Sequence, residues 1–186
     1  VYHSARKETI HPFDFAVKEG ETIGVIGGTG SGKSTFVSLI ARLYDVTSGR
    51  ILYRGVDEKE LKPEFIRGKI GFVPQKASLF EGSLRDNMKW GKEDATDEEI
   101  YQALDIAQAR EFVDQKEQGL DFRIEQNGGN LSGGQKQRLT IARALVRKPE
   151  ILILDDSASA LDFATDARLR KAIKENTDNM TVFLVS

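Results

Sequence analysis

A glycine-rich turn followed by a lysine and two hydroxyl residues is the part of this sequence best suited to bind phosphate. It reads Gly27-Gly28-Thr29-Gly30-Ser31-Gly32-Lys33-Ser34-Thr35. The order fits G-x-x-x-x-G-K-[ST], in which glycines let successive backbone N–H groups face one bound anion. We therefore predict that this turn holds a nucleotide, that Lys33 reaches its β- and γ-phosphates, and that the Ser34 hydroxyl binds Mg²⁺.

A strand before this turn and a helix after it must hold it in position, and the flanking residues have the patterns of these two elements. Thr22–Ile26 is a short apolar run that predicts a buried strand, and apolar residues recur at helical spacing from Thr35 to Leu43. The N-terminus of that helix adds unpaired N–H groups and a partial positive charge. The alternative, a flexible glycine loop with a solvent-facing lysine, leaves the flanking strand and helix unexplained.

A carboxylate at the end of another apolar run indicates where a metal ion would accompany the phosphate. Ile151–Leu154 predicts a buried strand, and Asp155 follows it directly. In open α/β sheets the carboxyl ends of the strands face the ligand, and in P-loop NTPases an aspartate at this place helps to hold Mg²⁺. A polar turn after a buried strand is the alternative, and it is less consistent with a phosphate-binding turn in the same chain.

A second set of glycines and a hydroxyl, Leu131-Ser132-Gly133-Gly134-Gln135, precedes a long helix predicted over residues 135–148. Such a helix start can bind a second anion. In the alternative interpretation Ser132 is only the N-cap of the helix. If one nucleotide met both glycine-rich segments, they would have to converge within one chain; otherwise the second segment serves the nucleotide of a neighbouring chain. The sequence leaves both possibilities open.

Apolar runs separated by helical patterns predict an α/β fold with a mostly parallel sheet covered on both faces. The runs are 22–26, 70–73, 151–154 and 181–186. Together with the glycine-rich turn, such a core resembles that of a P-loop NTPase (RecA-like). Residues 1–20 alternate between polar and apolar side chains, which predicts an N-terminal antiparallel β part with a turn near Gly20. Residues 57–69 predict a solvated helix or loop interrupted at Pro63.

Residues 80–145 are expected to form a mostly helical lobe inserted into this core. Thr96 and Glu99 make a capping box at the start of one helix. Four apolar residues then share one helical face: Ile100, Ala103, Leu104 and Ala107. Residues 1–79 and 146–186 would supply the α/β core of a single domain that spans 1–186.

The overall composition excludes several kinds of partner and site. With 27 basic and 29 acidic residues, the net charge of -2 gives no sign of a nucleic-acid surface. The absence of cysteine excludes disulfides and thiolate metal sites. No apolar run approaches the roughly 18 residues of a membrane span. We also expect both ends to be truncated, because residues 181–186 predict a strand that stops where a loop should follow.

Taken together, these motifs resemble the nucleotide-binding domain of an ATP-binding cassette (ABC) transporter, and the resemblance covers essentially the whole chain. Residues 27–34 match the Walker A motif, 151–155 Walker B, 131–135 the signature, Gln75 the Q-loop and 159–162 the D-loop. Tyr2 lies 31 residues before Lys33, where the family's A-loop aromatic stacks on adenine. Val73-Pro74-Gln75 and the segment from Leu79 to Asn87 are similar to the exporter branch in particular.

The resemblance implies ATP and Mg²⁺ as cofactors and assigns roles to individual residues. Lys33, Gln75 and Asp156 would take part in catalysis, and Ser34, Gln75 and Asp155 would bind Mg²⁺. The nucleotide would be contacted by Tyr2, by residues 27–35, by Ser132, Gly133, Gly134 and Gln135, and by Asp162.

The family also implies partners. Two such domains pair head to tail, so that Ser132, Gly134 and Gln135 of one contact the γ-phosphate held by Lys33 of the other. A transmembrane domain would carry the transported substrate, and the chain would work at the cytoplasmic face of a membrane, with no nucleic acid as partner.

Three positions depart from the family pattern. Asp156 stands where a glutamate usually polarises the attacking water, and its side chain is shorter by about 1.5 Å. A displacement of this size can lower a rate by about 10²-fold. The family's switch histidine would follow Ser186, and Gln126 replaces a glutamate common in exporters. An aspartate beside an intact signature resembles the degenerate-site half of a heterodimeric multidrug exporter, which we favour over an aspartate tolerated in a homodimer.

Four functions are compatible with some of these motifs. The first is an ATP-hydrolysing motor domain of an exporter, and the second is a nucleotide-binding module that gates its partner with little hydrolysis of its own. A third, an ABC ATPase of DNA maintenance, would need coiled-coil arms or tandem cassettes, and residues 80–130 show no sustained heptads. A P-loop kinase or GTPase leaves residues 131–135 unexplained. We favour the exporter domain.

Overall fold

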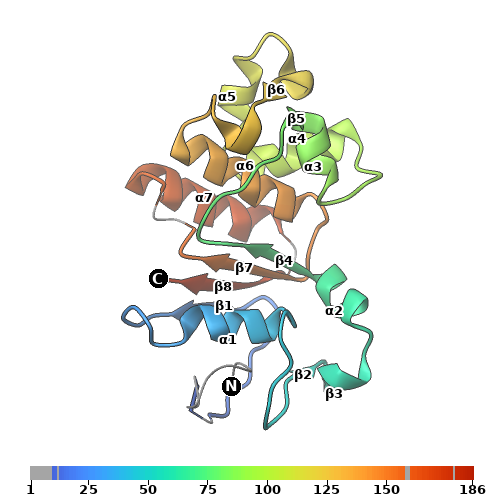
Figure 1. The fold of residues 1–186 in the computed structure, drawn as a ribbon, viewed down its shortest axis with the longest axis vertical. Helices are drawn as coiled ribbons and strands as arrows, with labels where there is room; N and C mark the ends of the chain where they lie inside the picture. Colours follow the sequence, from blue (N-terminus) through green and yellow to red (C-terminus); the bar gives the residue numbers. More distant parts are fainter. Residues whose placement is uncertain (1–9, 12, 158–159, 178) are drawn as a thin grey trace.

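A parallel sheet of four strands forms the centre of the computed structural model, which describes residues 10–11, 13–157, 160–177 and 179–186 (Figure 1). The strand order is β1-β8-β7-β4, and each neighbouring pair runs parallel. The strands are β1 (Thr22–Val25), β4 (Ile70–Val73), β7 (Ile151–Asp155) and β8 (Thr181–Val185). All four apolar runs of the sequence are therefore strands of this sheet.

Side chains alternate between the two faces of the sheet and pack into two separate clusters. Ile153, Phe183 and Val185 belong to one cluster, whereas Leu152 and Val182 belong to the other. Because successive residues of a strand point to opposite faces, these clusters lie on opposite sides of the sheet. Both faces are covered over β4, β7 and β8, which is why these strands are mostly apolar, whereas the edge strand β1 leaves Thr22 and Gly24 exposed.

One face of the sheet carries α1 (Lys33–Ile40) and α2 (Pro63–Lys69). Val37 and Ala41 of the α1 segment and Ile66 of α2 pack against Ile153 and Phe183 in the same cluster. At the same end of the molecule as α1 lie a short hairpin, formed by β2 (Leu52–Tyr53) and β3 (Val56–Asp57), and the 3₁₀ turn η1 (Glu58–Glu60) (Figure 1).

The other face carries α7 (Phe163–Asn176), α6 (Gly133–Leu145) and the remaining short elements. These elements are β5 (Gly82–Ser83), α3 (Leu84–Lys89), α4 (Asp97–Ile106), α5 (Arg110–Asp114), η2 (Gly119–Asp121), β6 (Arg123–Ile124) and η3 (Gln126–Gly128). We call α3–α6 the helical part, which lies at the far end of the molecule from α1 (Figure 1).

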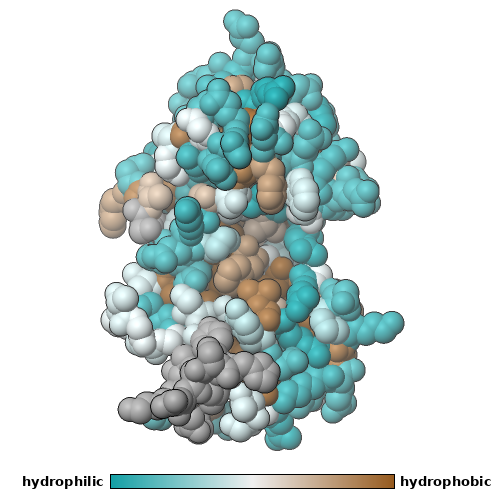
Figure 2. All heavy atoms as spheres, in the orientation of Figure 1, coloured by the Kyte–Doolittle hydropathy of each residue, from teal (hydrophilic) through white to brown (hydrophobic). Residues whose placement is uncertain are grey.

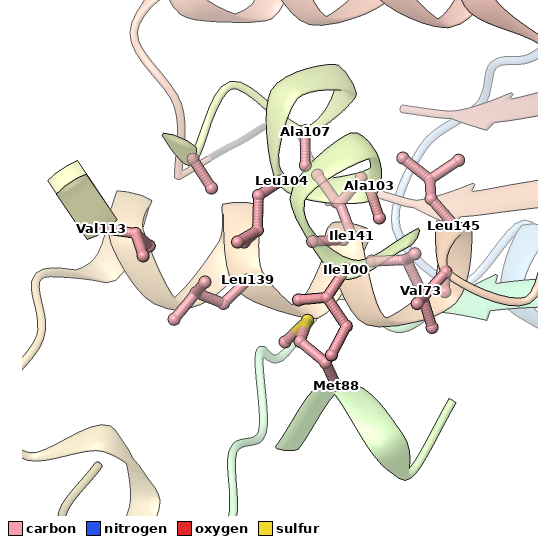
Figure 3. Packing of buried hydrophobic residues seen from close by; sticks show 14 of the residues in the cluster. Val73, Met88, Ile100, Ala103, Leu104, Ala107, Val113, Leu139, Ile141 and Leu145 are labelled. Atoms are coloured by element: carbon pink, nitrogen blue, oxygen red, sulfur yellow. The ribbon is translucent and has the colours of Figure 1, made fainter. Parts of the chain in front are cut away.

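The core of the helical part is built on α6. Leu139 and Ile141 of α6 are fully buried, as are Ile100 and Leu104 of α4. In Figure 3 the side chain of Met88 points from α3 toward Ile100 of α4. The predicted capping box at Thr96 is present, since its side chain accepts from the Glu99 N–H (3.2 Å). None of the helices in the described part of the chain is both long and apolar enough to span a bilayer.

The predicted fold class is confirmed: an α/β fold with a parallel sheet, small antiparallel sheets and a helical part. The prediction of strands over residues 1–20 is wrong for the described residues 13–18, which form no strand; there Phe13 and Phe15 pack their rings on Phe36 (5.5 and 5.8 Å). The turn near Gly20 is present, and residues 1–9 and 12 lie outside the described residues.

Residues 57–69 form two helical segments, η1 and α2, as the predicted interruption implies; the break lies at residues 61–62, and Pro63 begins α2. The first helical N–H has no partner within a helix, so proline is tolerated there. The division into a core of 1–79 and 146–186 and a lobe of 80–145 stays a prediction.

Candidate nucleotide-binding site

The loop between β1 and α1 ends in a helix start that no side chain caps. Gly32 occupies the N-cap position with a φ of 93°, a left-handed conformation that glycine adopts without strain. Its carbonyl oxygen accepts the first helical bond from the Phe36 N–H (2.8 Å). Because no side chain closes this end, the first turn of α1 presents its backbone N–H groups toward the loop and can bind an anion.

The ammonium of Lys33 lies over this loop. Its Nζ donates to the carbonyl oxygens of Gly27 (2.5 Å) and Gly28 (3.1 Å). An ammonium has three donors, so a third remains for an anion in the same place. The positive charge is therefore held beside the helix start and not extended into solvent.

A hydroxyl and a carboxylate meet at the carboxyl edge of the sheet. The Ser34 Oγ donates to the Asp155 Oδ1 (3.2 Å), and Asp155 is buried at the end of β7. Both are oxygen ligands of the kind that Mg²⁺ prefers, and this ion takes most of its other ligands from phosphate and water. Within the described ranges, no group of three His, Cys, Asp or Glu side chains could hold a metal by itself. The two residues fit a nucleotide-bound Mg²⁺.

Next to this pair, the Gln75 side chain holds Asp156. The Nε2 of Gln75 donates to the Asp156 Oδ2 (2.9 Å), and the Asp156 N–H donates to the Val185 carbonyl (3.1 Å). Asp156 has a φ of 46°, a region that aspartate tolerates better than most residues. Since β4 and β7 are parallel neighbours, the residues that follow them emerge side by side. The sheet thus brings together Gln75 and Asp156, which are 81 positions apart in the sequence.

The start of α6 is closed by its own side chains. The Ser132 Oγ accepts from the Gln135 N–H (3.2 Å), and the Gln135 Oε1 accepts from the Ser132 N–H (2.9 Å). Ser132 is therefore an N-cap, as the alternative interpretation held. The hydroxyl accepts in this bond, so its proton can still be donated to a phosphate oxygen.

Residues of the D-loop region lie against the start of α6. A Cβ added at Gly134 would stand 3.3 Å from the Ala160 carbonyl oxygen, which is closer than most side chains approach, whereas one at Gly133 would meet nothing within 4 Å. Asp162 caps α7 by accepting from the Thr165 N–H (2.9 Å) and hydroxyl (2.6 Å). These bonds lower the pKa of Asp162, so its carboxylate stays charged.

The structure separates the predicted site residues into two groups. Lys33, Ser34, Gln75, Asp155 and Asp156 meet at one edge of the sheet. The α6 start, with Ser132–Gln135, belongs to a helix on the other face from α1. Tyr2, predicted to stack on adenine, lies outside the described residues, as does the first D-loop residue, Ser159.

Sequence reasoning missed two features outside the motifs. Arg143 of α6 is partly buried and donates to the Ser78 carbonyl (2.8 Å); the available signal was a basic residue among apolar ones on a core helix. Trp90, 71% exposed, stacks on Phe80 at 4.7 Å between ring centroids. No local pattern indicated that these two aromatic residues would face solvent together.

Comparisons with known proteins agree with this geometry. A family model described as ABC transporter matches residues 10–159. An uncharacterized ABC transporter ATP-binding protein of Bacillus subtilis, YfiB, is 46% identical over 188 residues. The match covers 100% of this chain and 32% of YfiB. A probable multidrug resistance ABC transporter ATP-binding/permease protein of the same organism, YheI, is 41% identical, again over 100% of this chain and 32% of the relative.

A solved structure is also similar. The structure of a bacterial Atm1-family ABC exporter with ATP bound matches with a TM-score of 0.93 and 33% identity, over 99% of this chain and 32% of the other. The chain thus spans about a third of the length of these three relatives.

Proposed function

The chain belongs to the ABC transporter family, and from this premise we propose that it is the ATP-binding domain of an exporter, where it binds Mg-ATP and powers transport across a membrane. The observation that carries the proposal is the contact of the Ser34 hydroxyl with the Asp155 carboxylate (3.2 Å), beside the ammonium of Lys33. A cation, a carboxylate, a hydroxyl and an uncapped helix start at one sheet edge match the needs of a magnesium triphosphate.

Each group has a distinct task in binding. The first turn of α1 donates backbone N–H groups to the phosphates, and Lys33 adds a point charge at the β- and γ-phosphates. Mg²⁺, when bound, neutralises part of the phosphate charge, and Ser34 and Asp155 would hold it. Tyr2 is proposed to stack on the adenine.

Asp156 is the candidate general base, and Gln75 the residue that holds its carboxylate. A base must lie within hydrogen-bonding distance of the water it activates. Because aspartate is shorter than the glutamate usual in the family, we propose that this chain's own site turns over slowly. A second candidate function follows, a nucleotide-binding half that gates its partner with little hydrolysis, and the residue that favours it is Asp156.

We propose that a second nucleotide-binding domain completes the site. Since α1 and α6 pack on opposite faces of the sheet, the start of α6 is better placed to meet the nucleotide of a neighbour. Ser132, Gly134 and Gln135 would contact that neighbour's γ-phosphate, and Asp162 lies in the adjoining segment. With its intact signature, this chain would serve the active site of a heterodimer.

A membrane-embedded domain is the other proposed partner, and a surface of the helical part supports it. The stacked side chains of Phe80 and Trp90 are exposed, and a hollow of about 520 Å³ lined by residues 81–83, Asp121 and Arg123 adjoins Phe80 in the chain. The surface of the helical part is otherwise mostly polar in Figure 2, where the apolar residues gather lower down, at the level of the central sheet. Exposed apolar surface of this kind marks protein contacts. The chain would then work at the cytoplasmic face of a membrane.

A titration of ATP into Lys33→Ala tests the proposal. The substitution removes the point charge at the phosphates, so we expect no measurable binding at concentrations that saturate the natural protein. Lys171→Ala, an exposed lysine of α7, is the control and should bind normally. Unchanged affinity in Lys33→Ala would contradict the proposed site.

A further inference from the structure

Arg143, in the last turn of α6, is a partly buried cation that none of the roles above uses. Its Nη2 donates to the Ser78 carbonyl (2.8 Å), and its guanidinium carbon lies 5.5 Å from the centroid of the Phe80 ring. The Nη1 is buried and has no hydrogen-bond partner in the described part of the chain. Burial lowers the pKa of Arg143 from its usual value. The side chain thus holds the loop of residues 74–81 at two places.

Packing alone does not explain an arginine here. Removing a guanidinium from water is unfavourable unless every donor is paired, and the Nη1 of Arg143 is not. Replacing buried charges by apolar side chains of similar size is often neutral or stabilising. Ser78 is exposed, so water could satisfy its carbonyl without the arginine. We therefore explain Arg143 by its contacts with Ser78 and Phe80, which hold the loop of residues 74–81 in place.

The loop that Arg143 holds begins at the nucleotide-facing edge of the sheet. It connects β4 with β5, and Gln75, near its start, donates to the Asp156 carboxylate (2.9 Å). Asn87 of α3 fixes the far end, since it donates to the Phe80 carbonyl (2.9 Å) and accepts from the Phe80 N–H (2.8 Å).

Only a short piece of backbone separates the held residue from the catalytic edge. Three residues of chain, the step from Gln75 to Ser78, span at most about 10 Å. The short length of this segment limits how far Gln75 can lie from Ser78, so the position of Ser78 restricts that of Gln75.

We propose that Arg143 is a positioning residue for the nucleotide site: by anchoring Ser78 and Phe80 it sets where Gln75 lies opposite Asp156. The inference rests on the proposed function, because Gln75 and Asp156 are the candidate catalytic groups there. A misplacement of about 1 Å can lower a rate by about 10²-fold. Arg143 therefore acts on turnover, and nucleotide binding at residues 27–35 does not depend on it.

The first test measures kcat and KM of Mg-ATP hydrolysis by Arg143→Met in the natural full-length protein with its partner domain. Methionine fills the space without holding the loop, and we expect kcat to fall by about tenfold while KM stays within about twofold. Arg143→Lys keeps the charge near Phe80 and should recover part of the loss. Arg110→Met is the matched control, because Arg110 also lies over an aromatic ring, that of Tyr101 (3.9 Å), but pairs with Asp114. Its kcat should be that of wild type.

A double-mutant cycle with Gln75→Ala decides whether Arg143 acts through Gln75. If it does, Arg143→Met lowers kcat in the natural background and has little further effect once residue 75 is alanine. Effects that multiply, or a lower melting temperature with unchanged kcat, would overturn the proposal.

Hydrogen exchange of the amides of residues 75–81 separates this inference from the proposed function. Faster exchange confined to these residues in Arg143→Met supports the anchor, and exchange equal to wild type contradicts it. If the natural protein hydrolyses no ATP in the presence of its partner domain, the proposed motor function fails, while the exchange measurement still tests the anchor.

Discussion

Two helices of this molecule begin near glycines and a hydroxyl residue, but only one of them has a side chain that caps its first turn. α1 begins after Gly32, which has a left-handed backbone and offers no side chain as a cap. α6 begins after Ser132, which forms a reciprocal capping box with Gln135. The start of α1 is therefore open to an anion, whereas at the start of α6 two N–H groups, those of Ser132 and Gln135, are already bonded to side chains.

The residues that surround the two helix starts also differ. The α1 start has Lys33, Ser34 and the buried Asp155 from the same chain beside it. The α6 start packs Gly134 close to the Ala160 carbonyl and belongs to the opposite face of the sheet. One helix start is thus part of a site assembled within the chain, and the other is a preformed surface suited to a site that another chain holds.

The largest effect is expected where the chain's own site departs from its family. Asp156→Glu returns about 1.5 Å of reach to the candidate base. In the full-length protein with its partner domain, we expect it to raise the ATPase rate by about 10²-fold, measured at saturating Mg-ATP. An unchanged rate would mean that Asp156 does not slow hydrolysis at the chain's own site. The heterodimer would then lose its support, and a homodimer would be favoured.

The free energy of unfolding is also expected to fall as the pH rises, because of a buried carboxyl on the side of the sheet that carries α1 and α2. Glu58, in η1, is 1% exposed, and burial raises its pKa to about 7 from 4.5, although Arg42 opposes the shift. The folded protein therefore holds a proton that the unfolded chain releases above about pH 4.5. Stability is full below that pH and falls as the pH rises to about 7.

Glu58→Gln should remove this loss. Glutamine stays neutral, so we expect the free energy of unfolding at pH 8 to rise by about 3 kcal/mol, measured by denaturant titration from pH 4 to 8. Asp45, Asp57 and Lys59 also face this carboxyl, and their charges stay unchanged in the variant. Glu60→Gln, at an exposed position of the same turn, is the control and should keep the slope of wild type.

The smallest effect concerns the cap of α6. Ser132→Ala removes an N-cap and should lower the free energy of unfolding by about 1 kcal/mol. Thr96→Ala removes the equivalent cap of α4, so it should cost about the same. Only Ser132→Ala should also lower hydrolysis in the assembled protein, with ATP affinity at the α1 site unchanged. Equal activity in the two variants would mean that Ser132 is a cap and nothing more.

Much of the fold was predictable because its signals are local. The four strands of the central sheet follow from short apolar runs, and the capping boxes at Thr96 and Ser132 follow from a hydroxyl placed three residues before a glutamate or glutamine. Where the local pattern was weaker, it misled: residues 13–18 alternate like a strand, yet Phe13 and Phe15 pack on Phe36.

For the candidate site, the sequence by itself determined the residue types: the glycines of 27–32, Lys33, Ser34, and the carboxylates of Asp155 and Asp156. Only the tertiary structure decided which of them meet, because pairing of β4 with β7 brings Gln75 to Asp156 across 81 positions. It also decided that α1 and α6 lie on opposite faces, and that Arg143 reaches Ser78. A helix start or a strand end is specified by a few neighbouring residues, whereas contacts between distant segments depend on how the whole core packs.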